Sequence, residues 1–296
     1  MSPIDSPAVR RTTVWIPYLW LAVFALLPLI LTLKISLAQM QLGVPPYTPL
    51  IGADEVGQKT WLGTLANYKL LAADSLYVSA YLNSVRIAAV STLLALLLGY
   101  PMAYAIARAP QHWRVPLLML VLLPFWTSFL IRVYAWVGLL RPTGLINSAL
   151  LSMGFIDTPL RLINTEFAVY LGMVFCYLPY MLLPLYARLE KLDASLIEAA
   201  LDLGATPVRA FWRITLPLSL PGIYAGCLLV FVPAVGEFVI PELLGGADVL
   251  MIGKVLWSEF FSNRDWPVSS AVASVLLVIL VVPLLALQFY KTERAP

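Results

Sequence analysis

The chain has 296 residues, of which 61% are hydrophobic and only 12% are charged. A soluble domain of this length needs far more charge to cover its surface, so the composition excludes an ordinary water-soluble fold and indicates a membrane protein. The net charge of +3 is small and the basic residues are scattered between apolar runs, which gives no support to nucleic-acid binding.

Six apolar stretches reach the length of about 20 residues that a helix needs to cross a bilayer. Several contain proline or glycine, which transmembrane helices tolerate because neighbouring helices satisfy the freed backbone groups. The sequence therefore predicts an all-α membrane protein with six transmembrane helices in a single domain. The predicted spans are about 14–37, 83–107, 115–139, 166–186, 218–240 and 268–290.

The first stretch has a second interpretation, a cleavable secretory signal. Arg10 and Arg11 precede it, and residues 36–38 fit a small-residue cleavage site. Its uncharged core, residues 14–33, is longer than the roughly 7–15 residues of a signal's apolar region. We therefore expect a helix that stays in the protein.

Basic residues concentrate on the cytoplasmic loops of membrane proteins. About half of the 19 basic residues fall on the inner segments if both termini are cytoplasmic, which predicts an inner loop at 189–217 and outer loops at about 38–82, 140–165 and 241–267. These inner residues are Arg10, Arg11, Arg108, Arg114, Arg188, Lys191, Arg209, Arg213, Lys291 and Arg294. Acidic residues gather at the opposite side, which suits a cation; they are Asp54, Glu55, Asp74, Asp157, Glu166, Glu237, Glu242, Asp248, Glu259 and Asp265.

A polar, helix-prone stretch, EAALDLGATPVRAFWRITLP at residues 198–217, lies in the inner loop between spans four and five. Its pattern predicts a short helix from Ser195 to Leu203, with Ser195 and Glu198 at capping-box spacing and Gly204 as the stop. The apolar stripe on this helix fits either a docking surface for a partner or a helix lying flat on the membrane.

The order of residues in this stretch resembles the signature EAA-x3-G-x9-I-x-L-P of the permease subunits of binding-protein-dependent ABC importers. Glu198, Ala199, Ala200 and Gly204 match it, and Ile214 to Pro217 complete it. The resemblance implies the type I ABC importer permease (MetI-like) fold. It also implies that residues 195–204 form a coupling helix, which docks on a cytoplasmic ATPase and transmits its closure.

Five further stretches resemble the putrescine-type permease subunits of bacterial polyamine importers. They are PYLWL (17–21), SFLIRVYAW (128–136), PAVGEFVIPELLGG (233–246), MIGKVLW (251–257) and NRDWPV (263–268). The resemblance implies uptake of putrescine or a related polyamine such as spermidine across the bacterial inner membrane. The implied partners are a second homologous permease subunit, an ATP-binding cassette ATPase dimer, a periplasmic polyamine-binding protein and membrane lipid.

The chain lacks a phosphate-binding loop of its own. The nearest approach, Gly253-Lys254, has Asp248 where the first glycine is required and Val255 in place of the serine or threonine that contacts magnesium. We therefore expect no cofactor in this chain, with ATP and magnesium bound by the partner ATPase. His112 fits a solvated or headgroup-facing side chain better than a metal ligand, and the sequence predicts neither a metal site nor a catalytic site.

Ionisable and aromatic side chains near the outer ends of the spans are candidates for a substrate path. Rings pack the methylenes of a polyamine and attract its ammonium groups, and carboxylates pair with its ends. The alternatives are a salt bridge from Glu237 to Arg132 or Arg86, an interfacial belt for the aromatic residues, and loop anchoring for Asp265. Arg132 is expected to neutralise a carboxylate or reach the headgroups. The candidates are Glu237, Asp265, Trp126, Tyr134, Trp136, Tyr177 and Tyr180.

Two other classes of function fit less well. An ion-coupled carrier often shows inverted repeats with broken helices at the midplane, and we find neither a convincing repeat nor acids at the bilayer centre. A membrane-embedded enzyme needs a catalytic constellation. Within the ABC class, an importer for another solute such as an amino acid is the alternative.

Overall fold

The computed structural model of the protein describes residues 7–53 and 59–292. The chain forms two compact units, which we describe separately: residues 1–78 with 256–296 make unit 1, and residues 79–255 make unit 2. Asp54, Glu55 and Arg294, which entered the prediction of orientation, lie outside the described residues.

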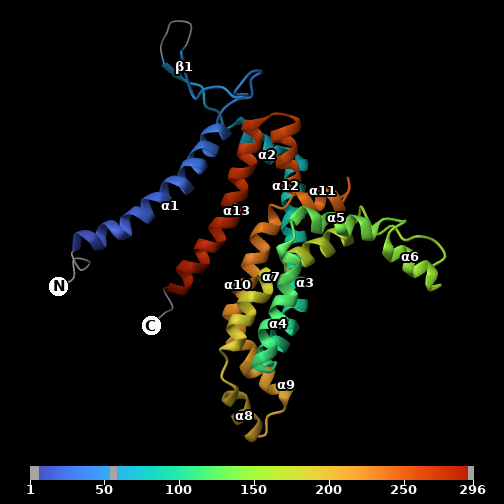
Figure 1. Ribbon diagram of the computed structural model, residues 1–296. Coiled ribbons are helices and arrows are strands. Elements are labelled where there is room, and N and C mark those ends of the chain that lie inside the picture. Colours follow the sequence, from blue (N-terminus) through green and yellow to red (C-terminus); the bar gives the residue numbers. More distant parts are fainter. Residues whose placement is uncertain (1–6, 54–58, 293–296) are drawn as a thin grey trace. The chain divides into compact units, whose positions relative to one another are not determined.

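Unit 1 contains two long apolar helices that pack against each other, α1 (Pro7–Ser36) and α13 (Trp266–Thr292) (Figure 1). No residue in the most apolar window of α1 is buried. A long helix that is apolar and exposed in this way is stable only if lipid surrounds it. The smaller elements of the unit are the antiparallel strands β1 (Ile51–Ala53) and β2 (Lys59–Trp61), helix α2 (Ala66–Ala73), the first turn of α3 (Ser75–Arg108) and the π turn η4 (Ser258–Ser262).

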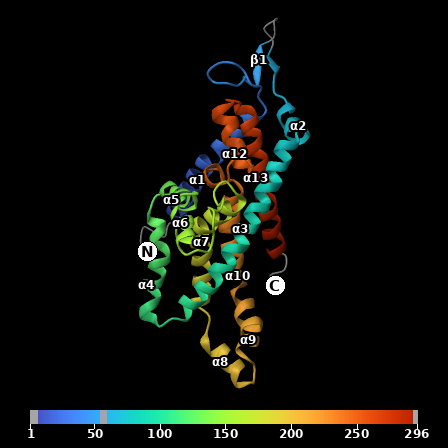
Figure 2. The same ribbon diagram turned by 90° about the vertical axis from the view of Figure 1, so that its right-hand side faces the viewer.

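Unit 2 is built around a pair of closely packed helices, α7 (Glu166–Glu190) and α10 (Leu216–Val235). Helices α8 and α9 lie at one end of this unit and α5 and α11 lie toward the other (Figure 1), and Figure 2 shows the same separation of α8 and α9 from α5. The remaining elements are most of α3, α4 (Gln111–Leu122), the 3₁₀ turn η2 (Leu123–Trp126), α5 (Phe129–Leu140), α6 (Leu145–Ser152), α8 (Ala194–Asp202), α9 (Pro207–Ala210), the π turn η3 (Phe211–Thr215), α11 (Val239–Leu244) and α12 (Ile252–Trp257), whose last two residues belong to unit 1.

Two glycines four residues apart bring α10 against α7. A Cβ atom at Gly222 would lie 3.0 Å from the carbonyl oxygen of Pro184, and one at Gly226 would lie 2.7 Å from the sulfur of Met181. Small residues at this spacing let two helix backbones approach closely, which is how helices gain packing energy in lipid. The pair sets the register of α7 on α10, and both candidate sites described below depend on that register.

Six helices of the described chain are long and apolar enough to cross a membrane. Each overlaps one predicted range, which confirms the prediction of six transmembrane helices. They are Thr13–Ser36, Ser75–Arg108, Phe129–Ser152, Glu166–Glu190, Pro207–Val235 and Trp266–Pro283.

The third range differs most from the sequence prediction. The predicted span 115–139 begins inside α4 and ends inside α5, and the chain leaves the helix between them at Thr127 and Ser128, where ψ is 155° and 140°. Pro124 contributes to the break because it opens the tighter turn η2 and has no N–H to continue an α-helical ladder. The continuous apolar run of the sequence hides this interruption.

Candidate functional site

The predicted coupling helix is α8, and its first turn differs from the prediction. The carboxylate of Asp193 accepts a hydrogen bond of 3.0 Å from the backbone N–H of Ser195, so Asp193 is the N-cap. The prediction of Ser195 as the cap, paired with Glu198, was wrong, because Asp193 lies earlier and starts the helix first. This hydrogen bond lowers the pKa of Asp193, since it favours the ionised carboxylate.

The end of α8 is a Schellman motif. The N–H of Ala205 donates to the carbonyl of Ala200 and the N–H of Gly204 donates to that of Leu201, both at 2.9 Å. Gly204 has φ of +83°, a conformation that costs side-chain-bearing residues about 1–2 kcal/mol. No atom lies within 4 Å of the position that its Cβ would take, so the backbone conformation and not space requires glycine here.

No residue of α8 is buried. Glu198 and Ala199 are exposed and Ala200 is half-buried. The exposed fractions of Leu196 and Leu203 are 46% and 89%, so the predicted apolar stripe is uncovered. An uncovered apolar surface next to charged residues is typical of a helix that docks on a partner.

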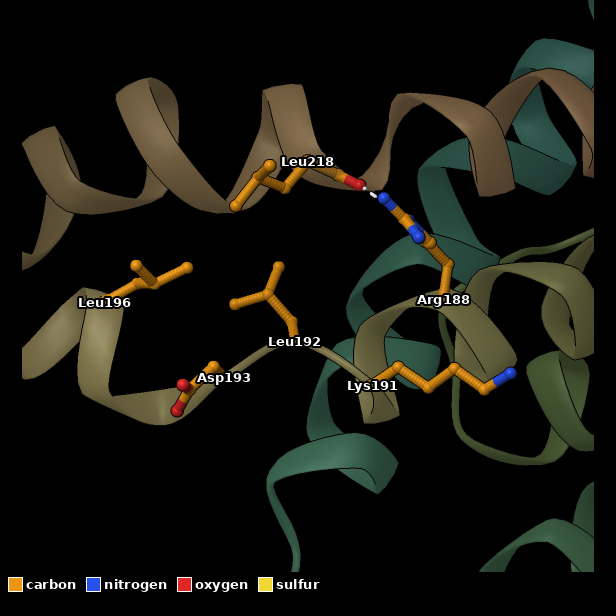
Figure 3. Close-up of a pocket in the computed structure, with 6 residues that line it drawn as sticks. All are labelled: Arg188, Lys191, Leu192, Asp193, Leu196 and Leu218. Atoms are coloured by element: carbon orange, nitrogen blue, oxygen red, sulfur yellow. Dashed lines mark hydrogen bonds between the residues drawn. The ribbon is translucent and has the colours of Figure 1, made fainter.

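A pocket of about 230 Å³ separates the start of α8 from the ends of α7 and α10. Figure 3 shows that Leu192, Leu196 and Leu218 lie around it, while Arg188 reaches across to the α10 backbone. The Nε of Arg188 donates a hydrogen bond of 2.9 Å to the carbonyl oxygen of Leu218. The end of α7 is therefore tied to the base of α10, beside the gap that separates both from α8.

Glu237 pairs with neither of the arginines considered from the sequence. Its Oε1 accepts hydrogen bonds from the N–H groups of residues 238–240, at 3.1, 2.9 and 3.4 Å, and its Oε2 accepts one from the hydroxyl of Tyr177. Arg86 is paired with Glu166 instead. Glu237 thus joins the start of α11 to α7, and hydrogen bonds stabilise its carboxylate, since no cation of the described chain lies within salt-bridge distance.

The candidate aromatic residues divide into two groups. Tyr177 and Tyr180 have ring centroids 6.0 Å apart and line one side of a cavity of about 460 Å³, whose other side is formed by α10. Trp136 packs edge-on against Phe175. Trp126 and Tyr134 are largely exposed and do not line this cavity. The α10 residues that line it are Leu228, Leu229, Val232 and Pro233.

Arg132 is buried and has no carboxylate within salt-bridge distance among the described residues. Its guanidinium carbon lies 4.7 Å from the ring centroid of Phe125 and 5.8 Å from that of Phe129. Because its Nε has no hydrogen-bond partner, aromatic faces are the main stabilisation of this charge. Of the two expectations for Arg132, neutralising a carboxylate was wrong for the described residues, and reaching the headgroups stays a prediction.

Asp265 belongs to unit 1, whereas the other candidates belong to unit 2. Its Oδ1 accepts a hydrogen bond of 3.0 Å from the N–H of Val268, which caps α13. Burial raises the pKa of Asp265 and the nearby charge of Glu259 raises it further, whereas the Val268 N–H opposes both. These contacts are those of an anchoring residue.

Phe125 is a residue that the sequence reasoning missed. Its ring meets that of Tyr180 edge-on at 5.2 Å, so it connects the Arg132 guanidinium to the cavity. The sequence feature that could have marked Phe125 as a candidate is its position beside Pro124, at the end of an apolar run. Among the described residues there is no group of three metal-ligating side chains.

The model of one family, described as the inner-membrane component of binding-protein-dependent transport systems, matches residues 9–293. The chain belongs to this family. This permease is 41% identical to the spermidine/putrescine transport system permease protein PotB of Haemophilus influenzae, over 96% of the permease and 94% of the relative. It is also 41% identical to PotB of Escherichia coli, over 93% and 94% of the two chains.

A solved bacterial ABC transporter involved in the import of the polysaccharide alginate has the same fold as this permease. The TM-score is 0.73 with 17% identity, and the match covers 99% of this permease and 98% of the solved chain. The predicted type I ABC importer permease fold is therefore confirmed. The permease is a multi-pass inner-membrane transport subunit.

Replacing Tyr177 by phenylalanine should lower the stability of the permease by about 1 kcal/mol, because Oε2 of Glu237 loses its hydrogen-bond donor. Thermal unfolding of the purified protein in detergent measures this as a fall in Tm of about 2 °C. Tyr134→Phe is the control, since it removes the same atom from an exposed ring. Equal effects of the two substitutions would show that the Tyr177 hydroxyl does not hold Glu237.

Proposed function

We propose that this chain is the permease subunit of an ATP-driven importer of putrescine, spermidine or a related polyamine. The observation that carries the proposal is the near full-length similarity to spermidine/putrescine permeases, together with an exposed α8 that holds Glu198, Ala199 and Ala200 of the coupling signature. A periplasmic binding protein delivers the substrate to the outer loops, and the binding protein supplies the affinity.

The cavity between α7 and α10 is the part of this chain that best suits a polyamine. Its volume of about 460 Å³ is within the usual range for small ligands. The rings of Tyr177 and Tyr180 pack against methylene groups and attract ammonium groups, at about 0.5–2 kcal/mol for each cation–π contact. The Glu237 carboxylate, held by Tyr177, gives the region a negative charge that favours a cation.

In this proposal, ATP and magnesium bind to a separate cytoplasmic ATPase dimer, because this chain has no phosphate-binding loop. The uncovered leucines of α8 are the contact for that ATPase. This assignment puts both termini in the cytoplasm. A second, homologous permease supplies the other half of the path.

ATP binding closes the two ATPase subunits, which push on residues 195–204. The membrane helices then move from an inward-open to an outward-open arrangement and the substrate enters. Hydrolysis resets the gate, so each transport cycle is driven by the ATPase and not by an ion gradient.

Uptake of labelled putrescine tests the substrate directly. Cells that lack this gene and all other polyamine importers should take up putrescine only when the gene and its partner genes are restored. Unlabelled spermidine should compete with it, and arginine should compete weakly. No recovery of uptake, with the permease present in the membrane, would contradict the polyamine assignment.

Replacing Glu237 by glutamine should slow putrescine uptake. A glutamine accepts the same backbone hydrogen bonds as Glu237 but lacks the charge, and a charge worth about 1 kcal/mol to a passing ammonium changes the rate about fivefold. Glu242→Gln is the control, because it removes a partly exposed carboxylate that pairs with Lys254. Wild-type uptake by the Glu237 variant would remove this residue from the path.

Replacing Gly204 by valine should uncouple transport from ATP hydrolysis with all six spans still inserted, because valine strains the left-handed turn that ends α8. Asparagine, which tolerates this conformation, should retain most activity. Gly138→Val is the control, since Gly138 also has no atom within 4 Å of its Cβ position but lies inside α5. Normal transport by the Gly204→Val variant would exclude the assigned turn as a coupling element.

A further inference from the structure

Helix α8 is joined to α7 by residues 191–193 and to α10 through the segment that follows it, α9 and η3. Its main packing contacts among the described residues are with α9 and the π turn η3. The pocket of about 230 Å³ leaves a gap between the start of α8 and the bases of α7 and α10, as Figure 3 shows. Packing contacts therefore provide one route for a displacement of α8, through α9 and η3.

The π turn η3 has an identifiable cause. In a regular helix the N–H of residue 217 would donate to the carbonyl of Arg213, but Pro217 has no N–H and its ring crowds that carbonyl. The helix widens instead, and the N–H of Leu216 donates to the carbonyl of Phe211. Single π turns inside helices are frequent at functional positions. The widened turn fixes how Phe211 and its neighbours are presented.

The ring of Phe211 lies against two tyrosines of α3. It meets Tyr100 edge-on at 5.8 Å and 89°, and Tyr104 edge-on at 6.0 Å and 90°. Because the two tyrosines are four residues apart, they lie on one face of α3 and form a two-ring contact surface for Phe211. Edge-on contacts of this kind are the favoured geometry for aromatic pairs.

This two-ring contact surface is itself held in place by contacts with α10 and with Arg108. The hydroxyl of Tyr100 is hydrogen-bonded to the Oγ of Ser219 on α10, at 3.0 Å, and Ser219 is fully buried. On the other side, the Arg108 guanidinium lies 5.6 Å from the Tyr104 ring centroid. Trp212, the next residue after Phe211, is 62% exposed and among the described rings contacts only Phe211.

From this geometry we infer that Phe211 is the positioning residue that transmits the displacement of α8 to α3. The inference rests on the proposed function only in taking α8 as the surface on which the ATPase acts. It adds a route from that surface, through η3, to the long transmembrane helix α3. It does not depend on which solute is transported.

The test compares Phe211→Leu with Trp212→Leu in the complete transporter reconstituted in lipid vesicles. Leucine keeps an apolar side chain and good helix propensity but removes the ring edges. We expect Phe211→Leu to raise the number of ATP molecules hydrolysed per putrescine transported at least fivefold, with normal ATPase content. Trp212→Leu should leave that ratio within twofold of wild type, and Phe211→Tyr should restore it.

Tyr104→Leu, on the opposite side of the contact, should reproduce the Phe211→Leu phenotype. An unchanged ratio in Phe211→Leu would overturn the inference. So would loss of the ATPase subunits from the Phe211→Leu complex, because Phe211 would then hold the ATPase and not transmit its motion.

A second readout separates this inference from the polyamine assignment. Spin labels on cysteines introduced at Leu203, directly after α8, and at Leu97 in α3, both exposed positions, report how far each helix moves when ATP is added. In the wild-type chain both helices should move relative to a reference label at Leu145 in α6, an exposed position. In Phe211→Leu only α8 should move; equal movement of α3 in both proteins would overturn the inference, even if putrescine is not the substrate.

Discussion

The close contact of α7 with α10 at Gly222 and Gly226 determines where both functional regions of unit 2 lie. Toward one end of the pair, the two tyrosines of α7 face α10 across the cavity. Toward the other, Arg188 is bonded to the base of α10 next to the coupling segment. One packed interface thus links the proposed substrate path to the proposed docking surface, and a shift in its register would alter both.

Charged groups in this protein follow the cost of burying charge in an apolar medium. Glu237 receives four hydrogen bonds, three from backbone N–H groups and one from Tyr177. Arg132 is covered by the rings of Phe125 and Phe129. Unit 2 therefore holds a negative charge at Glu237 and a positive charge at Arg132, and neither is neutralised by an ion pair within the described chain. An ammonium group near Glu237 does not have to displace a resident cation from it.

Patterns that depend on local sequence were predicted well. Apolar length predicted the six spans, and the local pattern at residues 195–204 predicted a short helix that stops at Gly204. The cap was misplaced because Asp193 and Ser195 are two residues apart and both are strong N-cap types. The break at residues 127–128 was missed because apolar residues continue on both sides of it.

Contacts between distant residues were not predictable from the sequence. Tyr177 is sixty residues from Glu237, and no periodicity in either helix marks one as the other's partner. The same holds for the two-ring contact surface of Phe211. In the sequence Tyr100 and Tyr104 are ordinary aromatic residues of a span, and only the packing of α10 against α3 brings them together with Phe211. The structure was needed because such pairings are decided by helix packing, which apolarity alone does not specify.

The most direct test of the central claim, that α8 is the surface through which a separate motor acts, is site-specific cross-linking in the assembled complex. A cysteine introduced at Leu203, which is 89% exposed at the end of α8, should cross-link to the ATPase subunit with a short bifunctional reagent. A cysteine at Leu145, which is 72% exposed in α6, should not. Cross-linking of the ATPase at both positions, or at neither in an active complex, would contradict the account.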